Sequence, residues 1–130
     1  MSTQRQALLV EDEPLVAMLV VDLLNELGFQ VLEAASGRKA REIAKNGLAD
    51  IALAVVDLGL PDEPGEKIIS EMKTIRPDLP IIVASGSGPG QNPQAFAVYE
   101  KLHILPKPYE FKGLRAAIGA LGVPLESSGT

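Results

Sequence analysis

Hydrophobic positions along the chain form five short apolar runs, and the longer segments between them carry apolar residues at helical spacing. The runs are rich in Val, Ile, Leu and Ala, and Gly, Pro or Asp flank them, which favours strands over helix fragments. The predicted strands are Ala7–Val10, Gln30–Ala34, Ile51–Val56, Ile81–Ala84 and His103–Leu105.

The longer segments predict one helix after each strand. The first begins at Pro14, which suits an opening helical turn, and stops before Gly28, which suits a left-handed end. The second ends before Gly47, and the third stops before Pro77. The predicted helices are Pro14–Leu27, Gly37–Asn46, Glu66–Ile75, Gln91–Lys101 and Phe111–Leu121.

The first predicted helix is apolar over much of its circumference. Met18 and Val21 fall on its outer face, where exposed apolar side chains suggest a docking patch for a partner. Single apolar residues are also common on protein surfaces and need no explanation. The residues that helical spacing places against the sheet are Val16, Leu19, Val20, Leu23 and Leu27.

Strand and helix alternate five times, which predicts an α/β fold: a doubly wound, five-stranded parallel sheet with helices on both faces. In such sheets, sites form at the carboxyl ends of strands, near the point where the strand order reverses. We expect one domain over residues 1–130, with a core at about 6–122 and a tail at 123–130.

Composition narrows the class of function. The formal net charge of −5 argues against direct nucleic-acid binding or attraction to an anionic membrane. The chain has no cysteine and only one histidine, His103, which excludes thiolate chemistry and histidine-rich metal sites. It has no apolar run of ~20 residues and no signal-peptide core, so we expect a cytoplasmic protein.

Polar side chains follow four of the predicted strands. Glu11 and Asp12 come after the first strand, Asp57 after the third, Ser85 after the fourth and Lys107 after the fifth. Neighbouring strand ends would bring these groups together. Clustered carboxylates repel one another, and a hard divalent cation such as Mg²⁺ relieves that repulsion through its preference for oxygen ligands.

This set of groups suits phosphoryl transfer. An aspartate carboxylate can act as a nucleophile and form an acyl phosphate. The reaction then needs positioning and neutralisation of the phosphoryl oxygens, which Lys107 and Ser85 could supply, while Gly86 leaves room. Alone, each residue has a plainer explanation: a helix-terminus charge, a turn residue or a surface lysine. The combination favours the functional interpretation.

Four motifs in order resemble bacterial response-regulator receiver domains. The resemblance covers roughly residues 6–122 and implies a flavodoxin-like sheet in the order 2-1-3-4-5. The motifs are Leu8–Pro14, Val55–Pro61 with Gly65 beyond it, Ile81–Gly86 and Leu105–Pro108.

The resemblance assigns a role to each site residue. It implies that Asp57 is the phospho-acceptor and that Lys107 and Ser85 contact the phosphoryl oxygens. It also implies a Mg²⁺ ion, bound directly or through water. The implied ligands are Glu11, Asp12, Asp57 and the backbone carbonyl of Gly59.

The resemblance further implies a signalling module that catalyses only its own phosphorylation and dephosphorylation. The phosphoryl group would come from a histidine kinase or histidine phosphotransfer protein. Output would pass to an unknown protein, or the chain would serve in a phosphorelay, with no direct contact to nucleic acid or membrane. The chain could be a stand-alone regulator or the receiver part of a hybrid kinase.

The chain departs from the receiver pattern at two positions. Ile104 replaces a frequent Tyr or Phe, so a switch must be read out without that aromatic side chain. Gly59 replaces a polar residue that can shield the phosphoryl group, and we expect this to affect hydrolysis. The glycine-rich segment Gly86–Gly90 is either a loose loop or a loop whose ordering forms the output switch.

Three other classes of protein share parts of this pattern. Small phosphohydrolases that form an aspartyl phosphate carry a second aspartate two residues after the nucleophile, where this chain has Gly59. A pseudo-receiver, which only binds partners, usually lacks the acceptor or the lysine. A flavodoxin-like electron carrier needs a phosphate loop after the first strand, where this chain has acids.

Overall fold

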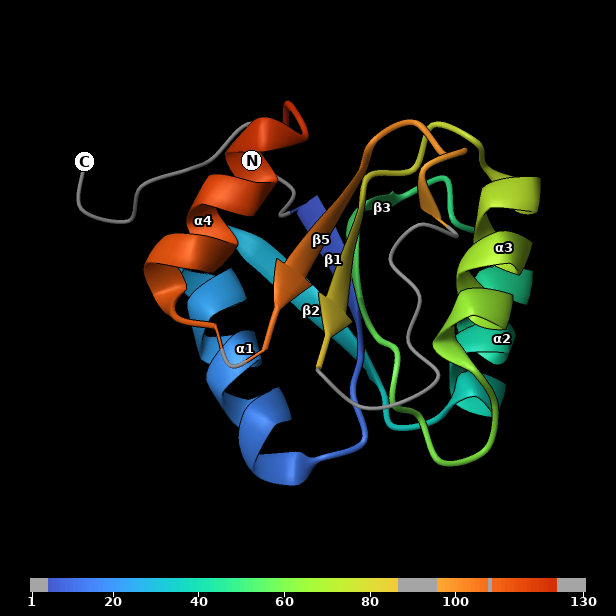
Figure 1. The fold of residues 1–130 in the computed structure, drawn as a ribbon, viewed down its shortest axis with the longest axis horizontal. Helices are drawn as coiled ribbons and strands as arrows, with labels where there is room; N and C mark the ends of the chain where they lie inside the picture. The colour runs from blue at the N-terminus through green and yellow to red at the C-terminus, as the bar shows by residue number, and fades with distance from the viewer. Residues whose placement is uncertain (1–4, 87–95, 108, 124–130) are drawn as a thin grey trace.

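A computed structural model describes residues 5–86, 96–107 and 109–123, which form one parallel sheet between two layers of helices (Figure 1). The strand order is β2-β1-β3-β4-β5, so the predicted doubly wound topology is confirmed. The strands are β1 (Arg5–Val10), β2 (Phe29–Ala34), β3 (Ile51–Asp57), β4 (Ile81–Ser85) and β5 (Leu102–Pro106).

The described residues contain four helices, two on each face of the sheet. Helices α1 and α4 cover one face, and α2 and α3 cover the other (Figure 1). None of these helices is long and apolar enough to cross a membrane. The helices are α1 (Pro14–Glu26), α2 (Gly37–Lys45), α3 (Gly65–Ile75) and α4 (Phe111–Ala120).

Strand β1 shows why the strands read as unbroken apolar runs. Leu8 and Val10 pack into the core under α2 and α3, whereas Ala7 and Leu9 pack into the core under α1 and α4. Because both faces of a doubly wound sheet are covered, alternate residues need not alternate in polarity. The buried strands therefore hold the carboxyl-end residues in fixed positions.

Strands β3 and β4 each extend one residue further at the carboxyl end than predicted. Asp57 is the last residue of β3 and pairs with Ala84 of β4, and Ser85 is the last residue of β4 and pairs with Pro106. Both polar residues are therefore held by the sheet, with exposed fractions of only 5% and 8%. The hydrophobic pattern cannot include them, because the strand ends in side chains that serve another purpose.

The predicted helix Gln91–Lys101 is wrong over the part that the structure describes. The segment from Phe96 to Lys101 forms turns, and Tyr99 N donates to the carbonyl oxygen of Phe96, three residues earlier (3.1 Å). The Lys101 carbonyl accepts from Ile81 N (2.9 Å), which commits it to the sheet. Residues 87–95, with most of the glycine-rich segment, and the tail from 124 lie outside the described residues.

The predicted inward face of the first helix is wrong at one position, Leu19, which is 65% exposed. Val20 and Leu27 are buried as predicted, and Val16 and Leu23 pack partly on the core. The outward position of Met18 is confirmed. Since most residues from 15 to 24 are apolar, helical spacing alone does not show that Leu19 lies outside the inward face, and packing against the sheet decides it.

Candidate functional site

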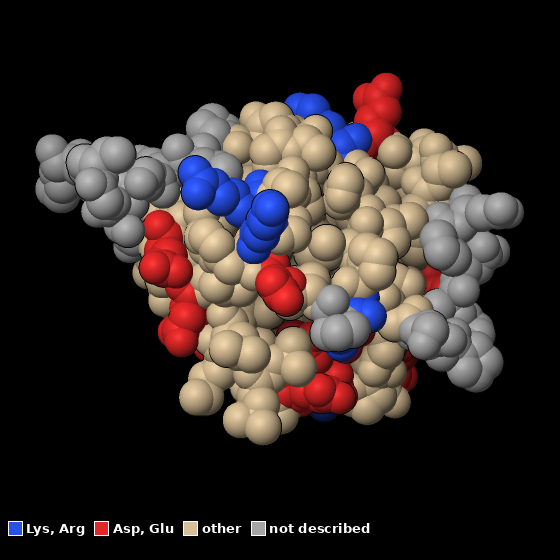
Figure 2. Space-filling model, turned by 60° about the vertical axis from the view of Figure 1, so that its left-hand side comes forward, with Lys and Arg blue, Asp and Glu red and all other residues tan. Residues whose placement is uncertain are grey.

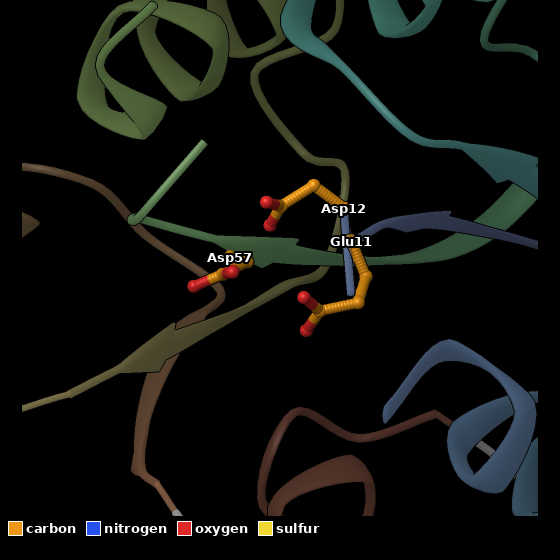
Figure 3. A group of neighbouring side chains, drawn as sticks. All are labelled: Glu11, Asp12 and Asp57. Carbon is orange, nitrogen blue, oxygen red and sulfur yellow. The ribbon is translucent and has the colours of Figure 1, made fainter. Parts of the chain in front are cut away.

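Three carboxylates meet at the carboxyl ends of β1 and β3. Glu11 and Asp12 follow β1 directly, and Asp57 ends β3, the neighbouring strand. One oxygen of each side chain lies within 4.8 Å of the others. Figure 3 shows the Glu11 and Asp12 carboxylates turned toward Asp57. The structure therefore brings together the three predicted carboxylates at the point where the strand order reverses.

Lys107 links the two buried carboxylates. Its Nζ lies 3.5 Å from Asp57 Oδ2 and 3.6 Å from Glu11 Oε1. Its position is fixed by the sheet, because Lys107 N donates to Ser85 O (2.8 Å) just beyond the end of β5. Burial alone would lower the pKa of Lys107, but the charges of Asp57 and Glu11 outweigh it and raise the pKa. The ammonium group therefore stays charged beside the acids.

Burial shifts the acid–base behaviour of Glu11. The side chain is nearly inaccessible, and burial together with the nearby charge of Asp57 raises the pKa of Glu11 to about 7. A hydrogen bond from Glu13 N to Glu11 Oε2 (3.2 Å) and the charge of Lys107 oppose this shift. Burial is thus the main reason why the ionised form of Glu11 is disfavoured in the folded protein.

The residues present fit a divalent cation. All three side chains offer oxygen ligands, which Mg²⁺ prefers, and the three carboxylates lie close enough to repel one another. A bound ion would relieve that repulsion. The backbone N–H of Gly59 donates a hydrogen bond to Asp57 Oδ1 at 3.1 Å. The role of the Gly59 carbonyl as a further ligand stays a prediction.

Ser85 and Gly65 complete the neighbourhood of Asp57. Ser85 lies at the end of β4, the next strand, so its hydroxyl stands at the same edge of the sheet. Gly65, at the start of α3, lies so close to β3 that an added Cβ would stand 2.8 Å from the Asp57 carbonyl oxygen and 2.7 Å from the Leu58 Cα. Only glycine permits this approach of α3 to the site.

Two other features near the site were not predicted from the sequence. Arg41 of α2 pairs with Glu63 and Glu71. Asp62 accepts hydrogen bonds from Gly37 N (2.9 Å) and Arg38 N (3.1 Å) at the start of α2. Together these contacts tie the loop after Asp57 to α2. Sequence spacing carries no signal for pairs 22 to 30 residues apart.

Tyr109 was also missed. It follows Lys107 by two residues, on the connection from β5 to α4, and its ring packs against the core under α1 and α4. The only signal in the sequence is its proximity to the lysine. Ile104, the position without the usual aromatic residue, is half-buried and packs against the opposite core, under α2 and α3.

A family model of the response regulator receiver domain matches residues 7–119. The chain therefore belongs to the response regulator receiver domain family, a class of phospho-accepting signalling domains in two-component systems. The match includes most of β1 and all of the other four strands, and every residue of the site lies within it.

Relatives in this family include both large and small proteins. The chain is 32% identical over 118 residues to the sensor kinase CckA of Brucella abortus, but spans 12% of that protein's length. It is 26% identical over 121 residues to the sporulation initiation phosphotransferase F of Bacillus subtilis, covering 93% of this chain and 95% of that protein.

Solved structures agree with the family assignment. A receiver domain protein from Clostridium thermocellum matches with a TM-score of 0.79 and 27% identity, over 89% of this chain and 92% of that one. A receiver protein from Sinorhizobium medicae matches with a TM-score of 0.78 and 28% identity, over 91% and 94% of the two chains.

Proposed function

We propose that Asp57 accepts a phosphoryl group in a reaction that requires Mg²⁺. The observation that carries this proposal is the setting of Asp57: a buried carboxylate beside one ammonium group and two further carboxylates. A buried carboxylate with a cation on one side is held in a single orientation for attack. The neighbouring acids supply a place for the metal ion that the transferred group would share.

The proposed step is a displacement at phosphorus. An Asp57 carboxylate oxygen forms a bond to the phosphorus atom, and the bond from phosphorus to the donor breaks, with its electron pair leaving on the donor. The product is an acyl phosphate, which water later hydrolyses to inorganic phosphate and free Asp57. Lys107 contacts one phosphoryl oxygen and the Ser85 hydroxyl donates to another.

Glu11, Asp12 and Asp57 would hold the ion, with the Gly59 carbonyl as a further ligand. Mg²⁺ supplies neutralisation of charge on the phosphoryl oxygens. The protein's own contribution is positional. Asp57 is fixed by the ladder to β4, and its Oδ1 accepts from Gly59 N, which orients the carboxylate.

The proposed phosphoryl donor is a histidine kinase or a histidine phosphotransfer protein. Exposed apolar side chains on α1 provide a surface for a partner helix beside the site: Leu15 is 77% exposed, Met18 61% and Leu19 65%. Val21, predicted to belong to this surface, is partly buried and packs against the core. A Met18→Asp variant should therefore slow transfer from a cognate donor.

Both a stand-alone regulator and a receiver within a hybrid kinase remain consistent with this proposal. A role in a phosphorelay is supported by the likeness to the phosphotransferase of B. subtilis over nearly its full length. The identity of the output partner is left open by this proposal.

The test is intact-mass spectrometry after incubation with acetyl phosphate, with and without Mg²⁺. Wild type should gain one phosphoryl group only with Mg²⁺, and Asp57→Asn should gain none. Asp50→Asn is the matched control, because Asp50 is an exposed aspartate just before β3. A folded wild type that gains nothing from acetyl phosphate would count against the proposal and favour a binding module without phosphoryl chemistry.

A further inference from the structure

A groove of about 650 Å³ opens between α1 and α4, next to the site. Apolar side chains of α1 form one wall, and Lys107 and Tyr109 belong to the other. Figure 2 shows this side of the molecule, with acidic side chains bordering a surface without charged side chains. Because Lys107 lines the groove and also contacts both buried carboxylates, the groove and the site adjoin.

The Tyr109 hydroxyl is buried at this junction, and no group in the described residues hydrogen-bonds to it. Its ring is fixed by packing in the core under α1 and α4. Buried hydroxyls are nearly always paired in folded proteins, because an unpaired one loses its bonds to water without compensation. A fixed, unpaired donor beside a reactive site suggests that its acceptor arrives in another state of the site.

The negative charges that act on Tyr109 belong to Glu11 and Asp57, which are therefore the candidate acceptors. Burial raises the pKa of the Tyr109 phenol, and the negative charges of Glu11 and then Asp57 raise it further. The hydroxyl therefore keeps its proton and acts as a donor. Glu11 Oε2 already accepts from Glu13 N (3.2 Å), whereas Glu11 Oε1 lies at the longer distance of 3.6 Å from Lys107 Nζ.

Phosphorylation of Asp57 would change which group Lys107 contacts, and so would change the partners of Glu11. This step rests on the proposed function, in which Lys107 turns its ammonium group to a phosphoryl oxygen. Lys107 is now shared between Asp57 and Glu11 at nearly equal distances. When the phosphoryl group takes Lys107, the Glu11 Oε1 oxygen loses this partner and becomes available to another donor.

We propose that the Tyr109 hydroxyl donates a hydrogen bond to the Glu11 carboxylate when Asp57 is phosphorylated. Tyr109 is thus a positioning residue: it acts through Glu11, which it holds in the orientation that the loaded site requires. Tyr109 lies between Lys107 and α4 and also lines the groove. The hydrogen bond would therefore couple phosphorylation of Asp57 to the position of this groove wall.

The experiment compares Tyr109→Phe with wild type and with Tyr99→Phe, the matched control, since the chain has two tyrosines. Beryllofluoride serves as an unreactive stand-in for the phosphoryl group. Isothermal titration measures binding of Mg²⁺ alone and of beryllofluoride in the presence of Mg²⁺. Thermal unfolding is measured without either ligand.

We expect Tyr109→Phe to weaken beryllofluoride binding about tenfold, the usual effect of losing one hydrogen bond to a charged group. Binding of Mg²⁺ alone should stay within about twofold of wild type, because Lys107 still serves Glu11 in that state. The unfolding temperature without ligands should be unchanged or higher. Tyr99→Phe should match wild type in both titrations.

Three results would overturn the inference. Equal beryllofluoride affinity in Tyr109→Phe would mean that the hydroxyl bonds only to water. An equal loss for Mg²⁺ alone would mean that Lys107 does not release Glu11. A lower unfolding temperature for Tyr109→Phe, beyond that of Tyr99→Phe, would mean that the hydroxyl already has a partner. A wild type that binds no beryllofluoride would instead overturn the proposed function, and this inference with it.

Discussion

Gly59 lies directly beside the Asp57 carboxylate. A Cβ added at Gly59 would stand 3.7 Å from Asp57 Oδ1 and 3.9 Å from Oδ2, which is ordinary contact distance. We predict that Gly59→Asn lengthens the lifetime of the phosphorylated protein several-fold. The amide would cover the phosphoryl group and hinder the approach of water. The measurement is the decay of the phosphorylated mass after acetyl phosphate is removed.

Gly59→Ala is the control for Gly59→Asn. It adds only the Cβ, so it should change the lifetime less than the asparagine does. If both variants lose the phosphoryl group at the wild-type rate, shielding at this position does not limit hydrolysis.

The residues of the site divide into those that the sequence could predict and those that it could not. Glu11, Asp57 and Lys107 were predicted because parallel strands carry their last residues to one edge. The buried, unpaired hydroxyl of Tyr109 was not predicted, because its burial depends on how α1 and α4 pack around it. The roles of Arg41 and Asp62 also depend on partners that are distant in the chain.

Lys73 ties helix α3 to the segment before β5. Its exposed fraction is 5%, and its Nζ donates to Leu79 O (2.8 Å), Pro77 O (3.1 Å) and Glu100 O. We predict that Lys73→Met lowers the free energy of unfolding by about 2–3 kcal/mol, because buried carbonyls lose their donor. Urea denaturation followed by circular dichroism measures this change.

Lys67→Met is the control on the same helix. The Lys67 side chain is 63% exposed and lies 3.9 Å from Glu63, so its loss should cost less than about 0.5 kcal/mol. If Lys73→Met is no more destabilising than Lys67→Met, the three carbonyl contacts contribute nothing to stability.

The elements themselves were predicted where one pattern fits the sequence. Strand β3 has a single interpretation, because its apolar run is short and bounded on both sides. Helix α1 is apolar at most positions from 15 to 24, so packing against β1 and β2 decides that Leu19 faces outward. The segment Phe96–Lys101 has helix-forming residues, yet the backbone hydrogen bond to Ile81 draws its end into the sheet.

At the scale of the whole molecule, strand order creates the site. Strand β1 lies between β2 and β3, so the ends of β1 and β3 adjoin although 46 positions separate Glu11 from Asp57 (57 minus 11). The alternation of strands and helices with right-handed crossovers leaves few orders that a chain of this length can adopt. That restriction is why four separate motifs can predict one site.

Stability should depend on pH through the same site. The pKa of Glu11 rises from 4.5 to about 7 on folding without metal, mainly through burial and then through the charge of Asp57. The folded protein therefore binds more protons than the unfolded chain between these values, and its stability falls as pH rises through that window. The full shift would correspond to at most about 3 kcal/mol.

Saturating Mg²⁺ should remove this fall, since a bound ion favours the ionised carboxylate, and Mg²⁺ should bind more tightly as pH rises toward 8. The measurement is urea denaturation at half-unit steps from pH 5.5 to 8.5, with Mg²⁺ or with a chelator. Glu11→Gln isolates the contribution, because the glutamine cannot titrate and its profile with chelator should be flatter than that of wild type. Parallel profiles for the two proteins would show that Glu11 ionises with an ordinary pKa, and any fall in stability would then come from another group.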